Sequence, residues 1–269
     1  MTAADIDEAV EVEPRSPVST SAGSVSAISL LGGVAAWEII GRIWTVSFFP
    51  PFSEVLSTLI ELVASGEIIG NLIASLTNLV FGFAISVVGG VAVGLAMGMF
   101  PIINSALDMY VYALLTAPSL VFAPIFFSIF GLGRGSIIAL IVMYAVFIII
   151  INTADGVRSV PRELIEMARS YNASNAQIAR WVIIPSAMPM IMAGLRIGVS
   201  RAVKGMINGE MFIAVVGLGR VVTQAGGRFD AAAVLAVLLV IIAVAWGAAA
   251  AVQAIDRKVT GWLPDVNRS

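Results

Sequence analysis

The chain has 269 residues, of which 59% are hydrophobic and only 12% are charged, and its net charge is −2. Soluble globular chains carry about 25% charged residues, so this composition excludes an ordinary soluble domain and predicts a protein whose solvent is lipid. Cysteine and histidine are both absent, which argues against disulfides, thiol nucleophiles, imidazole bases and the common transition-metal ligands. We therefore expect no catalytic residue and no metal site, and the small net charge gives no reason to expect a nucleic-acid partner.

The length is sufficient for an all-α integral membrane protein with about six transmembrane helices, because each helix needs roughly 20 residues to cross the hydrocarbon layer. Residues 1–24 are rich in Ala, Ser, Thr, Asp and Glu. They lack the basic start and apolar core of a signal peptide and predict a disordered tail. The first apolar segment, residues 25–44, contains Glu38 and Arg42, whose spacing places them on one helix face as an ion pair.

Two prolines, Pro50 and Pro51, end this first helix. Ser53 is then expected to cap a short amphipathic helix over residues 54–63 at the outer membrane surface. A second apolar run, residues 73–100, carries a small residue at every fourth position. These small residues are Gly82, Ser86, Gly90, Gly94 and Gly98. A smooth helix face of this kind predicts the close approach of another membrane helix.

The third apolar segment, residues 109–130, is interrupted by Pro118 and Pro124, with Thr116 and Ser119 beside the break. A proline inside a membrane helix frees backbone carbonyls that need protein or water as partners. This segment is therefore a candidate wall of a solute path, and the two hydroxyl residues are candidate path residues.

The fourth apolar segment, residues 136–153, is almost entirely aliphatic or β-branched, which predicts a lipid-facing helix. The extended polar stretch that follows, residues 155–186, is expected to lie in water and to meet partner proteins. The remaining parts are a fifth apolar segment at residues 188–216, a sixth at 231–255 and a C-terminal tail at 263–269. We expect residues 25–262 to form one membrane domain.

Basic residues are unevenly divided between the two sides that six crossings define. The tails and the polar loop hold eight of them and the opposite loops four: Arg15, Arg158, Arg162, Arg169, Arg180, Arg257, Lys258 and Arg268, against Arg42, Arg134, Arg220 and Arg228. Because cytoplasmic loops carry the excess of Lys and Arg, this distribution predicts a multi-pass protein with both termini in the cytoplasm.

The polar loop contains a spaced pattern. Glu166 and Ala168 are followed by Asn172, and nine residues separate Asn172 from the run Val182-Ile183-Ile184-Pro185. The pattern resembles the signature of the inner-membrane permeases of binding-protein-dependent ABC importers, which has a Gly where this chain has Asn172 and an Ala where it has Met167. The glycine ends a helix in the left-handed backbone conformation, and Asn is the non-glycine residue that best adopts it.

The resemblance covers residues 25–262 and is greatest to the nitrate, sulfonate and taurine group of permeases. It implies the type I ABC importer permease (MetI-like) fold and a short cytoplasmic helix that docks on the ATPase. The coupling residues that it implies are Glu166, Ala168, Arg169, Asn172, Ala173 and Pro185. A charged loop between membrane helices is also ordinary, and its arginines could serve topology alone.

The resemblance also implies partners and a location. These are a dimer of ABC ATPase subunits that bind ATP and Mg²⁺, an extracytoplasmic substrate-binding protein, a second permease copy that makes a homodimer, and the lipid of the bacterial inner membrane. The chain itself contains no Gly-x-x-x-x-Gly-Lys-Ser/Thr phosphate loop, so we expect it to hold no cofactor and not to hydrolyse ATP.

The fifth segment carries Lys204, Asn208 and Glu210, and ionisable residues at membrane depth indicate function. If Lys204 lines the solute path, it favours anions. Alternatively, Lys204 pairs with a carboxylate of a neighbouring helix or extends its amine to the cytoplasmic surface. Asn208 and Glu210 are further candidate path residues.

Two other classes of protein remain as alternatives. A stand-alone secondary transporter or channel often shows internal repeats around broken helices, and the two halves of this chain show no convincing repeat. A membrane-embedded enzyme needs a converging set of acids and bases, which a chain without His and Cys supplies poorly.

Overall fold

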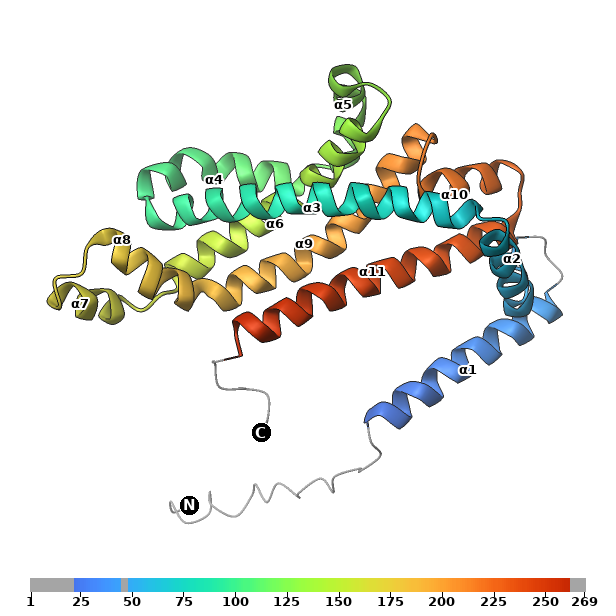
Figure 1. The fold of residues 1–269 in the computed structure, drawn as a ribbon, viewed down its shortest axis with the longest axis horizontal. Helices are drawn as coiled ribbons and strands as arrows, with labels where there is room; N and C mark the ends of the chain where they lie inside the picture. The colour runs from blue at the N-terminus through green and yellow to red at the C-terminus, as the bar shows by residue number, and fades with distance from the viewer. Residues whose placement is uncertain (1–21, 45–47, 262–269) are drawn as a thin grey trace, which may run out of the picture. The chain divides into compact units, whose positions relative to one another are not determined.

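The computed structural model describes residues 22–44 and 48–261, and within these residues the chain is helical and has no strand (Figure 1). Five helices are long and apolar enough to cross a membrane, and a sixth crossing is present if one bent pair counts as a span. The prediction of an all-α membrane protein with about six spans is confirmed. The predicted tails, residues 1–24 and 263–269, lie almost entirely outside the described residues.

By internal contacts the chain divides into two units, residues 1–53 and 54–269. The first unit contains α1 (Ala22–Ile43), and α2 (Phe52–Ala64) begins at its end. The helices of the second unit are α3 (Glu67–Met99), α4 (Pro101–Thr116), α5 (Ala123–Phe130), α6 (Arg134–Arg158), α7 (Arg162–Ser170), α8 (Asn175–Ile178), α9 (Ile184–Ile213), α10 (Leu218–Gly227) and α11 (Ala231–Val259). A 3₁₀ turn (Ser119–Phe122) and a π turn (Ala179–Ile183) complete it.

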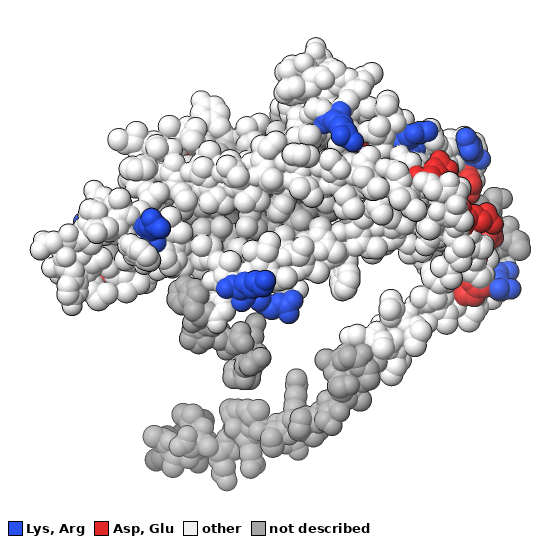
Figure 2. Space-filling view, in the orientation of Figure 1, with Lys and Arg blue, Asp and Glu red and all other residues white. Residues whose placement is uncertain are grey.

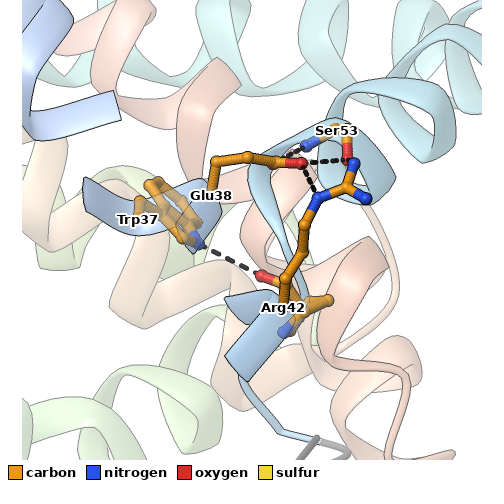
Figure 3. Close-up of polar contacts among 5 residues, drawn as sticks. Trp37, Glu38, Arg42 and Ser53 are labelled. Atoms are coloured by element: carbon orange, nitrogen blue, oxygen red, sulfur yellow. Dashed lines mark hydrogen bonds and ion pairs between the residues drawn. The ribbon is translucent and has the colours of Figure 1, made fainter. Parts of the chain in front are cut away.

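In the first unit, the end of α1 is bonded to the turn that follows it (Figure 3). Glu38 accepts a bond of 2.6 Å from Arg42 Nε, as predicted, and bonds of 2.9 Å from the backbone N–H and the hydroxyl of Ser53. Trp37 Nε1 donates to the Pro50 carbonyl at 3.1 Å. The prediction that Ser53 caps the next helix is wrong, because α2 begins one residue earlier and the hydroxyl of Ser53 donates to Glu38 instead.

In the second unit, α6 packs along α3 and α9 (Figure 1). The predicted small-residue face of α3 makes the first contact: a Cβ added to Gly90 would lie 2.8 Å from a methyl of Ile149, and one added to Gly94 would lie 2.6 Å from the Ile150 carbonyl. The prediction of a close helix approach is confirmed, and the partner is α6.

The opposite contact of α6 uses a second row of glycines, on α9. A Cβ added to Gly194 would lie 2.7 Å from Asn152 Cβ, and one added to Gly205 would lie 3.0 Å from Tyr144 Cβ. Gly198 and Gly209 make similar contacts. The α6 helix therefore lies between two glycine-rich faces.

The prediction that the fourth segment faces lipid is wrong. Of the five candidate spans in the described residues, α6 has the largest buried share, and Ile137, Leu140, Ile141 and Ile149 are fully buried. The physical reason is that lipid tails and the interior of a membrane protein are equally apolar, so aliphatic composition does not distinguish the two surroundings.

The third segment is broken at Pro118, as predicted. The helix α4 ends at Thr116, and the chain turns by 98° into the 3₁₀ turn and α5. Pro124 does not interrupt a helix, because it lies in the first turn of α5, where a missing N–H costs nothing. Ser136 closes the other end of α5 by donating to the carbonyls of Phe126 and Gly131.

Charged side chains are sparse on the long helices. On the face shown in Figure 2, they gather near the helix ends, and the surface between is nearly all uncharged. This distribution fits helices that cross a hydrocarbon layer, in which a charged residue is costly.

The contact between α3 and α6 yields a testable prediction. Gly94→Ala would place a methyl group 2.6 Å from the Ile150 carbonyl and is expected to lower the free energy of unfolding by about 1–3 kcal/mol through overpacking. Gly89, on the same helix, has nothing within 4 Å of an added Cβ, so Gly89→Ala should be neutral or stabilise by up to about 1 kcal/mol. Thermal unfolding in detergent measures both, and equal effects would contradict the proposed packing.

Candidate functional site

The first short helix of the polar loop is α7, which has an acidic residue in its first turn and a basic residue in its last turn. Glu163 lies in the first turn and Arg169 in the last, an arrangement that the helix dipole favours. The Ala173 N–H donates to the Ala168 carbonyl at 3.2 Å, and the Asn172 N–H donates to the Arg169 carbonyl at 2.9 Å. These two bonds form a Schellman motif. Asn172 has φ of 57°, so the predicted left-handed conformation at this position is confirmed.

The next helical segment has a side-chain cap and continues into the membrane. Ser174 forms a capping box: its backbone N–H donates to Gln177 Oε1 at 2.8 Å, and its hydroxyl accepts from the Gln177 N–H. From α8 the chain passes through the π turn into α9 without leaving helical conformation. Pro185 lies in the first turn of α9. The segment α8, the π turn and this 30-residue helix therefore form one continuous run of helical backbone.

The surface of the loop carries large apolar side chains among its charges. Met167 is 56% exposed, Trp181 71% and Tyr171 83%. Next to them lies a cavity of about 310 Å³, whose lining includes Ala168, Tyr171, Asn172, Ala173, Gln177 and Trp181. Exposed apolar groups that surround a cavity in a polar segment are typical of a protein docking surface.

The residues of the spaced pattern are only partly brought together. Ala168, Asn172 and Ala173 line the cavity at the loop surface. Arg169 lines a second cavity of about 560 Å³ between the loop and the ends of α3 and α6. Glu166 is exposed on α7. Pro185 lies apart from them, at the start of α9.

The candidate path residues Thr116 and Ser119 lie at the bend after α4. Thr116 is exposed and its hydroxyl donates within its own helix, to the Tyr112 and Ala113 carbonyls at 3.1 and 3.0 Å. Ser119 is half-buried in the 3₁₀ turn.

The three polar candidates on α9 have different surroundings. Lys204 is exposed, and no carboxylate in residues 22–44 or 48–261 forms an ion pair with it. Asn208 is half-buried and donates to the Tyr144 hydroxyl at 2.8 Å. The Glu210 side chain, in contrast, is 0% exposed.

Glu210 lies near the end of α9 opposite the polar loop (Figure 1). Its carboxylate accepts from the Ser75 hydroxyl at 2.8 Å, the Asn78 amide at 3.4 Å and the Gly219 N–H at 3.2 Å. On α3, Asn71 accepts from the Gly217 N–H at 3.1 Å beside this carboxylate, and none of Asn71, Ser75 and Asn78 was predicted as a site residue. These three residues are spaced by four and three positions, which places polar groups on one face of an apolar helix. That pattern could have indicated a buried polar contact.

The model of the family described as binding-protein-dependent transport system inner membrane component matches residues 86–261. The chain belongs to this family. It is thus the permease subunit of an ABC importer, and the fold and function that the spaced loop pattern implied are confirmed.

Individual relatives agree with this assignment. The taurine transport system permease protein of Escherichia coli (strain K12) is 30% identical over 250 residues, which are 90% of each chain. The putative aliphatic sulfonates transport permease protein of Bacillus subtilis (strain 168) is 30% identical over 231 residues, 85% of this chain and 84% of the relative. The nitrate import permease protein of Synechocystis sp. (strain ATCC 27184 / PCC 6803 / Kazusa) is 33% identical over 149 residues, 55% of this chain and 54% of the relative.

Solved structures support the fold. An inward-facing structure of the MetNI methionine ABC transporter matches with a TM-score of 0.61 and 22% identity, over 69% of this chain and 93% of the matched chain. The MetI-like fold that the resemblance implied is confirmed by this match.

Proposed function

We propose that this permease moves a small solute with an anionic group, of the nitrate, sulfonate or taurine type, across the bacterial inner membrane by alternating access, driven by partner ATPase subunits. The observation that carries the proposal is the loop between α6 and α9. It is closed by a Schellman motif and a capping box, exposes Met167, Tyr171 and Trp181, and continues into α9. Such a segment can receive a displacement from an ATPase and pass it into the helix bundle as a rigid lever.

The partners follow from the same proposal. ATP and Mg²⁺ are bound and ATP is hydrolysed by two ATPase subunits that dock on the loop, and this chain holds no cofactor. A second copy completes the channel as a homodimer surrounded by lipid, and a binding protein delivers the solute from outside. The excess of basic residues in the tails and the polar loop supports the placement of both termini and of this loop in the cytoplasm.

The docking role of the loop is tested by Met167→Asp. Met167 is 56% exposed, so the substitution is expected to leave the fold intact. Because it places a charge at an apolar contact, it should reduce ATP-dependent uptake by at least about tenfold. Uptake of radiolabelled taurine is measured in proteoliposomes that contain the permease, its ATPase and its binding protein.

The control for this experiment is Arg162→Ala, at an exposed position about 140° around α7 from Met167. Its uptake should remain near that of the wild type. Undiminished uptake by the Met167→Asp variant would contradict docking at this surface. Uptake by the wild type without ATP would indicate a secondary transporter instead.

For the solute path, we propose that Lys204 faces the passing anion. The support is that its amine is exposed on an apolar helix and has no ion-pair partner among the described residues. An unpaired ammonium group in such surroundings attracts an anion. Thr116 and Ser119 stay candidates for the same path, and the half-buried Asn208 lies four residues from Lys204 on α9.

This assignment predicts that Lys204→Ala abolishes taurine uptake while the binding protein still stimulates ATP hydrolysis. Lys204→Arg should retain uptake because it keeps the charge. Ser200→Ala, one turn earlier on α9 at an exposed position, is the matched control and should transport normally. Unchanged uptake by Lys204→Ala would remove Lys204 from the path.

A further inference from the structure

The end of α9 that lies away from the coupling loop is bonded to two other helices through one buried carboxylate. Glu210 is 0% exposed, and so is Ser75, which donates to it from α3 at 2.8 Å. Among residues 22–44 and 48–261 no Lys or Arg pairs with Glu210. The carboxylate is therefore held by neutral donors alone.

The same cluster fixes the beginning of α10. The first four N–H groups of a helix have no partner within the helix, and here three of them donate to side chains of other helices. The Gly217 N–H donates to Asn71 Oδ1 at 3.1 Å, the Leu218 N–H to Ser75 Oγ at 2.9 Å and the Gly219 N–H to Glu210 Oε2 at 3.2 Å. The start of α10 is thus bonded to both α3 and α9.

The backbone at the start of α10 lies so close to Glu210 that it leaves no room for side chains there. Gly217 has φ of 88°, and a Cβ there would overlap the Glu210 carboxyl group. A Cβ on Gly219 would lie 2.6 Å from Glu210 Cβ. The two glycines of the Gly217-Leu218-Gly219 run allow the backbone to lie directly against the carboxylate.

We propose that Glu210 is a positioning residue for transport, which locks α10 to α3 and α9 so that a displacement entering α9 at the coupling loop also moves α10 on the opposite side of the membrane. This inference rests on the proposed function in that α9 acts as the lever. It assigns Glu210 a hydrogen-bonding role rather than a charge-carrying role in the solute path.

The substitution that separates these roles is Glu210→Gln. Its amide oxygen can take the place of Oε2 and accept from Ser75 and Gly219. Its NH₂ group takes the place of Oε1, to which Asn78 Nδ2 donates, so the Asn78 side-chain amide must turn over. Asn78 Oδ1, which is buried and has no hydrogen-bond partner among the described residues, then accepts from this NH₂ group. A locking role therefore predicts that Glu210→Gln works and Glu210→Ala does not, whereas a role that needs the charge predicts that both fail.

The position of α10 is measured directly with spin labels. The chain has no cysteine, so two introduced cysteines give one labelled pair. Ile69→Cys on α3 and Gln224→Cys on α10 are both at exposed positions. The distance between the two spin labels is measured by double electron–electron resonance in nanodiscs. Glu210→Ala and Ser75→Ala should broaden the distance distribution, and Glu210→Gln should leave it narrow. The control is Thr77→Ala, because the bond that the Thr77 hydroxyl makes to described residues lies within α3, to the Ile73 carbonyl.

The amount of taurine moved per ATP hydrolysed is measured in proteoliposomes with the ATPase and the binding protein. It should fall at least about tenfold for Glu210→Ala and Ser75→Ala, the size expected from losing a bond to a charged group. Glu210→Gln and Thr77→Ala should remain within about twofold of the wild type. If Glu210→Ala does not fold, the same two measurements on Ser75→Ala test the inference.

The inference is overturned if Glu210→Gln loses transport as completely as Glu210→Ala, or if Glu210→Ala and Ser75→Ala both keep the wild-type ratio and a narrow distribution. A wild-type assembly that moves none of nitrate, an alkanesulfonate and taurine with ATP would instead contradict the proposed function, and the spin-label distances would still report on the lock.

Discussion

The architecture of the second unit depends on the close approach of α6 to α3 and α9. In lipid the hydrophobic effect does not hold helices together, so their association depends on packing and on hydrogen bonds between them. Glycines at positions such as Gly90 and Gly94 on α3, and Gly194 and Gly205 on α9, bring backbones near enough for many atoms of α6 to be in contact at once. Each van der Waals contact is weak, but together these contacts stabilise the packing of the three helices.

This core has one polar attachment at each end of α9. At the start, the capped segments of the loop pass into the helix through the π turn and Pro185. At the other end, the Glu210 cluster bonds α9 to α3 and α10. A helix that is packed along its length and attached at both ends moves as a body, which is what alternating access between two states of a bundle needs.

Features that depend on local spacing could be predicted from the sequence. The small-residue face of α3, the Glu38–Arg42 pair and the left-handed Asn172 each follow from residues a few positions apart, and the structure confirms them. Their physical causes, helix periodicity and backbone sterics, act within one or two helical turns.

Features that depend on distant residues could not be predicted. Ser75 and Glu210 are separated by 135 positions, and nothing near either one indicates the other. The short helix α10 was missed for the same reason, since its start is held by groups on α3 and α9. The burial of α6 was mispredicted because its partners, and not its own composition, decide whether it faces lipid.

The proposed docking of the ATPase on the segment between α6 and α9 is tested most directly by photo-crosslinking from single introduced cysteines in the assembled transporter. A benzophenone label on Tyr171→Cys, at a position 83% exposed in the loop, should crosslink to the ATPase, and a label on Phe229→Cys, at a position 91% exposed beyond α10, should not. Crosslinking to the ATPase from Phe229→Cys, or none from Tyr171→Cys, would contradict the account.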